Sequence, residues 1–314
     1  MNEKNSENNM LLENKNIVIT GSGRGIGKYI ALLCAKEGAN IGLTSRTLDE
    51  LNNVKNEIEK INSGVKVSVH EGDITDLEEV KTILKNFHED LGPLNGVVAN
   101  AGWHDSQPSL TYDLNIFRKI IDVHILGVYY TFRASYPYLK KDDKKDNARF
   151  VLTGSMYFLA TMATTRPNRL PYIIAEYGLV GLIKALTKEF KKENITFNMV
   201  VPQTTDTFLT RGENAEDGNK PNLFLNPWDI SVYYLFLLSE YANNYHFKLL
   251  NTFDFEEVKK IISEAPSDKK NSIDEFLEYL KVKNEILYRN VKSLSNFVEF
   301  LLHYPHAPSL LLSV

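Results

Sequence analysis

The stretch NIVITGSGRGIGKYIALLCAKEGA, residues 16–39, decides the fold of this chain. A short β-favouring run is followed by a glycine-rich turn and then by an apolar helical pattern that reaches Lys36. Gly21, Gly25 and Gly27 allow a tight turn that a pyrophosphate can approach, and the helix behind it presents N–H groups and a positive dipole end. A glycine pattern placed between a strand and a helix indicates dinucleotide binding. We therefore expect a dinucleotide site at residues 21–27.

The same alternation of strand and helix continues along the chain. The expected strands cover residues 16–20, 40–45, 65–70, 95–100, 149–154 and 195–201, with a candidate last strand near 246–253. The longest helical pattern between them runs from about Tyr112 to Lys140. Repeated strand–helix units with apolar strands predict the α/β class, with a Rossmann-type, doubly wound parallel sheet covered on both faces.

Two pairs of residues are spaced as capping boxes. Thr47 with Glu50, and Thr75 with Glu78, have the Thr-x-x-Glu pattern that marks the start of a helix. We therefore expect helices to begin directly after Thr47 and Thr75.

Three segments of different character follow from the pattern. Residues 1–9 are polar, lack the apolar core of a signal peptide and are expected to form a disordered tail. Residues 10–253 form the expected Rossmann domain, and residues 254–314 form a helical C-terminal extension. The extension could be an appendage, an oligomer contact or a lid, and its pattern does not choose among them. Residues 203–226 form a long polar loop of the kind that shapes binding sites.

Composition narrows the choice of partners. With 43% apolar and 24% charged residues, the chain is typical of soluble globular proteins. A net charge of −4 gives no general attraction to nucleic acid or to an anionic membrane. No apolar run reaches the ~18 residues of a membrane span, and no histidines stand at metal-ligand spacing. We expect a small-molecule substrate, a homo-oligomer, no metal and, from the single Cys34, a reducing cytoplasm.

The end of the second expected strand indicates the cofactor. Sites for NAD place an acidic residue there to bind the ribose diol, whereas this chain has Thr44, Ser45 and Arg46. Arg24 lies within the glycine turn. Two guanidinium groups favour a ribose phosphate over a diol, so NADP(H) is preferred and NAD(H) is the alternative. In the opposing interpretation, Arg46 begins a loop and points to water.

From about Met10 to Phe253 the chain resembles the short-chain dehydrogenase/reductase family. The resemblance rests on TGSGRGIG, GDITD, ANAG, VLTGS, PYIIAEYGLVGLIKAL and VVPQTTDTF. It implies a catalytic Ser155 and Tyr172, with Glu176 and His124 at two further catalytic positions. The expected cofactor-binding residues, which include the two arginines above, are Gly21, Ser22, Gly23, Arg24, Gly25, Ile26, Gly27, Arg46, Asp73, Ile74, Asn100, Ala101, Gly102, Tyr172, Pro202, Thr205 and Thr207.

The chain departs from the family pattern at four places. Glu176 replaces the lysine of Tyr-x-x-x-Lys, His124 replaces the helix asparagine, and Gln203 replaces the glycine of Pro-Gly. The segment between Ser155 and Tyr172 is also longer than usual. In the family, the lysine lowers the pKa of the tyrosine and holds the nicotinamide ribose.

A carboxylate in place of the lysine reverses the local field. We expect Tyr172 to stay protonated far above neutral pH, which suits carbonyl reduction and disfavours alcohol oxidation. Glu176 could still accept hydrogen bonds from ribose hydroxyls, with a compensating cation from Arg166, Arg169 or His124. Otherwise Glu176 points to solvent, and His124 is an ordinary hydrogen-bonded histidine of the fold.

The sequence favours an NADP(H)-dependent oxidoreductase acting on a carbonyl/alcohol pair. One alternative is a catalytically impaired homologue that binds cofactor and serves as a regulator or subunit. Another is an isomerase or lyase that retains its cofactor and uses Glu176 as the base.

Overall fold

The computed structural model describes residues 10–141, 146–158, 167–215, 224–243, 245–251, 260, 264–266, 268, 273–283 and 300–301. The strands are β1 (Asn16–Thr20), β2 (Asn40–Thr44), β3 (Val67–Val69), β4 (Gly96–Ala99), β5 (Ala148–Thr153), β6 (Ile195–Val201) and β7 (Leu249–Asn251). The α-helices are α1 (Gly25–Lys36), α2 (Leu48–Ile61), α3 (Leu77–Leu91), α4 (Leu114–Ile121), α5 (Gly127–Ser135), α6 (Leu170–Glu189), α7 (Phe208–Arg211), α8 (Pro227–Leu238) and α10 (Ile273–Lys283).

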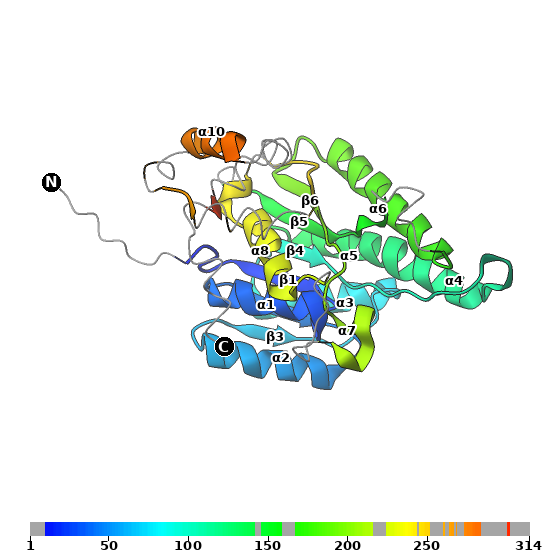
Figure 1. Ribbon diagram of the computed structural model, residues 1–314. Helices are drawn as coiled ribbons and strands as arrows, with labels where there is room; N and C mark the ends of the chain where they lie inside the picture. Colours follow the sequence, from blue (N-terminus) through cyan, green and yellow to red (C-terminus); the bar gives the residue numbers. More distant parts are fainter. Residues whose placement is uncertain are drawn as a thin grey trace.

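The seven strands form one sheet in the order β3-β2-β1-β4-β5-β6-β7, and every pair is parallel. The chain winds outward from β1 to β3, returns to the middle at β4 and then winds the other way (Figure 1). Ligands of such sheets bind outside the carboxyl ends of the strands where the order reverses. The sheet therefore directs attention to the ends of β1 and β4. The predicted Rossmann-type parallel sheet is confirmed.

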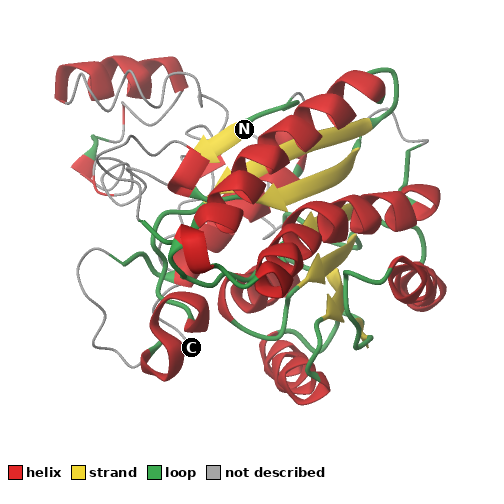
Figure 2. Cartoon of the chain, turned by 90° about the vertical axis from the view of Figure 1, so that its right-hand side faces the viewer, coloured by secondary structure: helices red, strands yellow, loops and turns green. Residues whose placement is uncertain are grey.

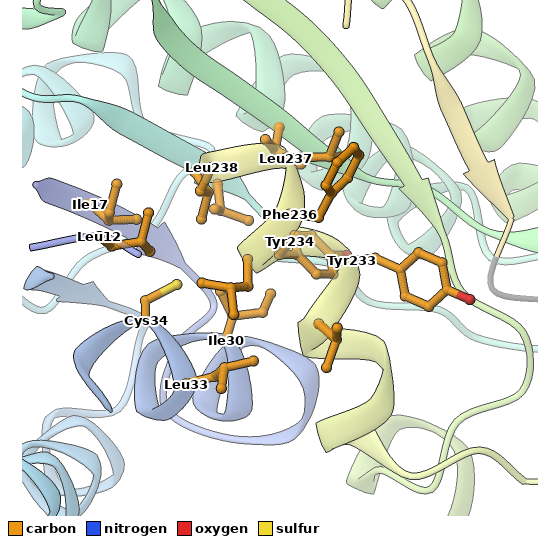
Figure 3. Packing of buried hydrophobic residues seen from close by; sticks show 14 of the residues in the cluster. Leu12, Ile17, Ile30, Leu33, Cys34, Tyr233, Tyr234, Phe236, Leu237 and Leu238 are labelled. Atoms are coloured by element: carbon orange, nitrogen blue, oxygen red, sulfur yellow. The ribbon is translucent and has the colours of Figure 1, made fainter. Parts of the chain in front are cut away.

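Helices cover both faces of the sheet (Figure 2). One core cluster joins the sheet to α1, α2 and α8, and a second joins it to α3, α5 and α6. Figure 3 shows part of the first cluster, where Ile30 and Leu33 of α1 and Tyr234 of α8 lie together. Cys34 is buried there, and burial raises the pKa of its thiol, so this cysteine belongs to the core.

The expected long helix at 112–140 is interrupted. Its place is taken by α4, a π-helical turn at Asp122–Leu126, and α5, followed by a 3₁₀ turn at Tyr136–Tyr138. Apolar periodicity does not distinguish these forms, because a single wide turn barely disturbs the pattern. The consequence for the site is that His124 lies inside the π-helical turn.

The two capping boxes are not formed. Thr47 precedes α2, but its side chain makes no cap hydrogen bond, and the Glu50 carboxylate contacts Arg24 instead. Helix α3 is capped by Asp76, whose carboxylate accepts from the backbone N–H groups of Glu78 and Glu79. Asp76 competes successfully because a carboxylate next to the first turn is an equally good N-cap and also suits the helix dipole.

The expected tail at 1–9 lies outside the described residues, as does much of the stretch after 253. In that stretch, the described residues Ala265, Phe276, Leu280, Phe300 and Leu301 are buried in the first core cluster.

Candidate functional site

A cavity of about 490 Å³ opens at the carboxyl ends of the central strands. Its walls come from the loops that follow the first six strands, β1 to β6. The end of α4, the π-helical turn after it and the first turns of α6 and α7 complete them. All four predicted catalytic residues line it, and so do all predicted cofactor residues except Ser22 and Gly27.

Ser22 and Gly27 shape the loop from behind. The Ser22 hydroxyl accepts a hydrogen bond from the backbone N–H of Thr44 at 3.0 Å, which ties the glycine turn to β2. A Cβ on Gly27 would lie 2.2 Å from the carbonyl oxygen of Gly21. These two residues therefore hold the turn in place, and other residues face the cavity.

The glycine turn presents a free helix end to the cavity. Gly21 and Gly25 have φ of +65° and +54°, a region that side-chain-bearing residues rarely adopt. Helix α1 begins at Gly25, and its N-cap residue Arg24 makes no side-chain cap. The first N–H groups of α1 are thus available to an anion, and the dipole of the helix favours one there.

Arg24, Arg46 and Glu50 line the cavity at the glycine turn. The sequence pattern had assigned Glu50 to the cap of a helix. Arg24 Nη1 is 3.4 Å from Glu50 Oε1, and the Arg24 guanidinium lies 4.1 Å from the centre of the Phe208 ring. Arg46 is exposed and also lines the cavity. The sequence offered no sign of the Arg24–Glu50 contact, because it depends on how α2 packs beside the turn.

Asp73 and Asn100 occupy ordered loops at the cavity wall. Asp73 Oδ1 accepts from the backbone N–H of Thr75 at 2.9 Å and from its hydroxyl at 2.8 Å. Asn100 donates from Nδ2 to the carbonyl oxygens of Thr20 and Gly21, and its Oδ1 accepts from the Thr153 hydroxyl at 3.1 Å.

That network continues into the core. The Thr153 hydroxyl lies 2.6 Å from the hydroxyl of Tyr234 on α8, and burial raises the pKa of that tyrosine. Sequence reasoning missed both residues, since a threonine at a strand end and a tyrosine in an apolar helix carry no distinctive signal.

Ser155 and Tyr172 meet as the resemblance implied. Ser155 follows the end of β5, and Tyr172 lies in the first turn of α6 behind Pro171, which is well tolerated there. Both are buried, and their side chains are hydrogen-bonded. The pKa of Tyr172 is held well above its usual value, first by burial and second by the Glu176 charge, while Ser155 and Arg169 act weakly in the opposite direction. The predicted direction agrees, but the leading cause is burial, which spacing alone did not reveal.

Glu176 faces inward, so the interpretation that it points to solvent is wrong. Its side chain is 1% exposed and lines the cavity one turn after Tyr172. Oε1 lies 3.4 Å from His124 Nδ1, whereas Oε2 has no hydrogen-bond partner among the described residues. Of the two described candidates for a compensating cation, Arg169 and His124, it is His124 that lies beside the carboxylate. Arg166 lies outside the described residues.

His124 is fixed from its other side as well. Its Nε2 lies 3.1 Å from the backbone N–H nitrogen and 2.8 Å from the carbonyl oxygen of Trp103. The imidazole meets the Tyr172 ring edge-on, with 5.1 Å between the ring centres. His124 is therefore both a hydrogen-bonded histidine of the fold and a neighbour of the catalytic tyrosine.

An aromatic wall completes the cavity near Tyr172. Tyr157 and His104 each meet the Tyr172 ring edge-on, at 5.6 and 5.5 Å between centres. Trp103 also lines the cavity, and the Arg169 guanidinium lies 5.6 Å from the centre of the Tyr157 ring.

The segment after β6 also lines the cavity. It contributes Pro202, Gln203, Thr205 and Thr207, and it leads into α7. A Cβ on Gly25 would come within 3.3 Å of Thr207 Cγ2, so this segment packs directly against the glycine turn.

The described residues hold no group of three or more His, Cys, Asp or Glu side chains arranged to bind a metal ion. One described helix, α6, is long and apolar enough to cross a membrane by length and composition, a test that core helices also pass. Its Leu179, Ile183 and Leu186 are buried in the second core cluster.

Comparison with known proteins agrees with this geometry. Residues 15–218 match the family described as short chain dehydrogenase. A (−)-trans-carveol dehydrogenase of Rhodococcus erythropolis is 29% identical over 266 residues, covering 74% of this chain and 93% of the relative.

Two solved structures show the same fold. An alcohol dehydrogenase from the archaeon Thermococcus sibiricus, complexed with 5-hydroxy-NADP, has a TM-score of 0.66 and 27% identity over 76% of this chain and 95% of its own. A carveol dehydrogenase from Mycobacterium avium in complex with NAD has a TM-score of 0.68 and 24% identity over 77% and 96%.

Proposed function

The chain belongs to the short-chain dehydrogenase family, and from that membership we propose that it is an NADP(H)-dependent oxidoreductase that reduces a carbonyl group to an alcohol. The observation that carries the proposal is the buried, hydrogen-bonded pair of Ser155 and Tyr172 in the cavity wall. The remaining geometry supports a cofactor beside that pair.

The cavity fits a dinucleotide. The N-terminus of α1, which has no side-chain cap, and the turn at Gly21 and Gly25 would hold the pyrophosphate, because the first N–H groups of a helix and its dipole favour an anion there. Asp73 and Ile74 would meet the adenine, and the segment at Asn100 would border the nicotinamide side. The cofactor, when bound, supplies the hydride.

Tyr172 provides the proton. Because burial and the Glu176 charge keep its phenol protonated, Tyr172 can donate from Oη to a carbonyl oxygen, while Ser155 holds that oxygen by a hydrogen bond. Oxidation of an alcohol would instead need the tyrosinate, which the same surroundings disfavour. This asymmetry supports reduction as the favoured direction.

The choice of NADP(H) rests on Arg24 and Arg46. Both line the cavity near the turn, where a 2′-phosphate would find two guanidinium groups. The solved relatives divide, one holding 5-hydroxy-NADP and another NAD. Glu50 opposes the preference, since its carboxylate already engages Arg24.

For the substrate we propose an apolar carbonyl compound that carries a ring. Trp103, Tyr157 and Phe224 line the cavity, and aromatic walls favour flat or cyclic apolar groups. The carveol dehydrogenase relative is consistent with such a substrate.

Assembly and location complete the proposal. Leu114, Ile174 and Tyr177 on α4 and α6 are 66%, 47% and 54% exposed, which supports a homo-oligomer that covers them. The buried, unbridged Cys34 is compatible with the reducing cytoplasm in which we place the enzyme.

The test is NADPH oxidation with a panel of cyclic ketones, compared between the unaltered protein and Tyr172→Phe. We expect steady oxidation that stays level through neutral pH, because the acid remains protonated there. Tyr172→Phe should lose the reaction and still bind NADPH. The control is Tyr129→Phe, a tyrosine on α5 that is 37% exposed and does not line the cavity, which should behave as the unaltered protein does.

A second candidate function has an observation in its favour. Glu176 stands in the lysine position, which supports a cofactor-binding homologue without turnover. If the unaltered protein binds NADPH but oxidises none with any ketone, this regulatory or subunit function replaces the reductase. Conversion of a substrate without net change in NADPH would instead favour an isomerase or lyase that uses Glu176.

A further inference from the structure

One side-chain oxygen of the cavity-lining residue Glu176, Oε2, has no hydrogen-bond partner among the described residues. Glu176 Oε2 is fully buried and makes no hydrogen bond there, although its residue is a carboxylate with only 1% of its side chain exposed. Buried polar atoms in native proteins nearly always have partners, and a carboxylate oxygen left alone is especially costly. An unpaired oxygen on a cavity wall therefore points to a ligand that supplies the missing donor.

The other carboxylate oxygen is held by His124. The imidazole Nδ1 lies 3.4 Å from Oε1, and the ring is fixed on its far side by the Trp103 backbone. The π-helical turn at Asp122–Leu126 carries His124 into this position. With Oε1 beside the imidazole, Oε2 is the carboxylate oxygen that lacks a partner among the described residues.

The surroundings of Oε2 are the end of β5 and the cavity wall. A Cβ added to Gly154, directly after β5, would lie 3.5 Å from Oε2 and 2.7 Å from Met199 Sδ, so Gly154 borders the oxygen closely. Gly154, Ser155 and Tyr172 all line the cavity beside it. A donor that reaches Oε2 must therefore lie close to the reacting pair.

We propose that Glu176 binds a ligand hydroxyl through Oε2 and that His124, donating from Nδ1 to Oε1, is its positioning residue. The proposal rests on the reductase function above. The hydroxyl belongs either to the nicotinamide-side ribose of the cofactor or to the substrate alcohol. In both cases an acceptor stands where the family lysine would be a donor, and His124 supports it in place of the family asparagine.

The first test measures binding with Glu176→Gln, which keeps the side-chain shape. With His124 Nδ1–H engaging the amide oxygen, the amide NH₂ would face the ligand and the acceptor would be lost. We expect NADPH affinity, measured by fluorescence titration, to fall about tenfold, in line with loss of a hydrogen bond to a charged group. The affinity for 2′,5′-ADP, which lacks the nicotinamide ribose, should not change.

The arms of this experiment separate the two sources of the hydroxyl. Weaker NADPH binding with unchanged 2′,5′-ADP binding assigns the hydroxyl to the cofactor. Unchanged NADPH binding with a raised dissociation constant for cyclohexanol in the NADP⁺ complex assigns it to the substrate. If neither constant changes in Glu176→Gln, the proposal is overturned. The matched control is Glu189→Gln, at the exposed far end of the same helix, which should change nothing.

The second test examines His124 without any ligand. Nitrogen-15 NMR of the imidazole rings, with His124→Asn identifying the signal, should show a hydrogen on Nδ1. In Glu176→Gln that signal should move, whereas the Glu189→Gln spectrum should match the unaltered one. A ring that carries its hydrogen on Nε2 alone would overturn the positioning role. Because this readout needs no turnover, it tests the pair even if the reductase function fails.

The third test exchanges both residues for the family pair. His124→Asn alone leaves Oε1 without its partner, and Glu176→Lys alone places a cation against the imidazole. We expect each single variant to weaken binding of the ligand that the first test identifies, which is NADPH or cyclohexanol in the NADP⁺ complex. The double variant should recover about tenfold over the value expected from adding the two losses. Additive losses would show that the two residues do not act together.

Discussion

Glu50 shows how one side chain can oppose a preference that a sequence pattern suggests. The sequence placed it in a helix cap, where it would be irrelevant to cofactor choice. In the structure its carboxylate lies 3.4 Å from Arg24 and lines the cavity at the turn. A bound 2′-phosphate would have to share Arg24 with this anion.

We expect Glu50→Gln to raise the affinity for NADPH relative to NADH by about 1.4- to fivefold, the range of a partly exposed ion pair worth about 0.2–1 kcal/mol. The cause is removal of an anion that neutralises Arg24. Fluorescence titration of both cofactors measures it. Glu57→Gln is the control, because Glu57 pairs with Lys28 across the same two helices but does not line the cavity. An equal change for both cofactors would show that Glu50 does not select between them.

Individual site residues differed in how far the sequence could predict them. Tyr172, Ser155 and Glu176 line the cavity, because the family register fixes their positions on α6 and after β5, and their catalytic roles stay predictions. The contact of Glu176 with His124 was one of three options, since it depends on how a π-helical turn packs against α6. Thr153 and Tyr234 were missed because their role arises from a tertiary hydrogen bond.

At the scale of elements, the strands were easier to predict than the helix ends. β1 and β6 have the predicted bounds, and β2, β4 and β5 differ by a residue or two. Short apolar runs in a buried parallel sheet have few alternatives. Helix starts were harder, because several Ser, Thr or Asp residues near one start can each act as the cap.

The start of α3 offers a direct measurement of that competition. Asp76→Ala should lower the free energy of unfolding by about 1 kcal/mol, since two backbone N–H groups lose their acceptor. Urea denaturation followed by circular dichroism measures the loss. Glu78→Ala is the comparison, because the capping box would need the Glu78 side chain, whereas the structure does not use it as a cap. A larger loss in Glu78→Ala than in Asp76→Ala would favour the box.

For the whole molecule, the open question from the sequence was the C-terminal stretch. Its pattern allowed an appendage, an oligomer contact or a lid. The described residues Phe276, Leu280 and Phe300 are fully buried in the core cluster that also contains α1 and α8. The Phe300 ring lies 5.5 Å from that of Phe236 on α8, and none of these residues lines the cavity. The described part of the stretch therefore supports the fold from the face that carries α8.

We expect Phe300→Ala to lower the free energy of unfolding by about 3–5 kcal/mol, the usual cost of removing a buried aromatic ring.

Removal of all residues from Asn271 onward should go further and reduce solubility or change the oligomeric state, because apolar surface on α8 would be uncovered. Denaturant unfolding and size-exclusion chromatography measure the two effects. The control is Val282→Ala, because the Val282 side chain on α10 is 85% exposed. This variant should leave the unfolding midpoint unchanged. NADPH affinity of folded Phe300→Ala should also stay unchanged, since Phe300 does not line the cavity. A truncated protein with unaltered size, solubility and unfolding midpoint would show that the stretch is an appendage despite its buried rings.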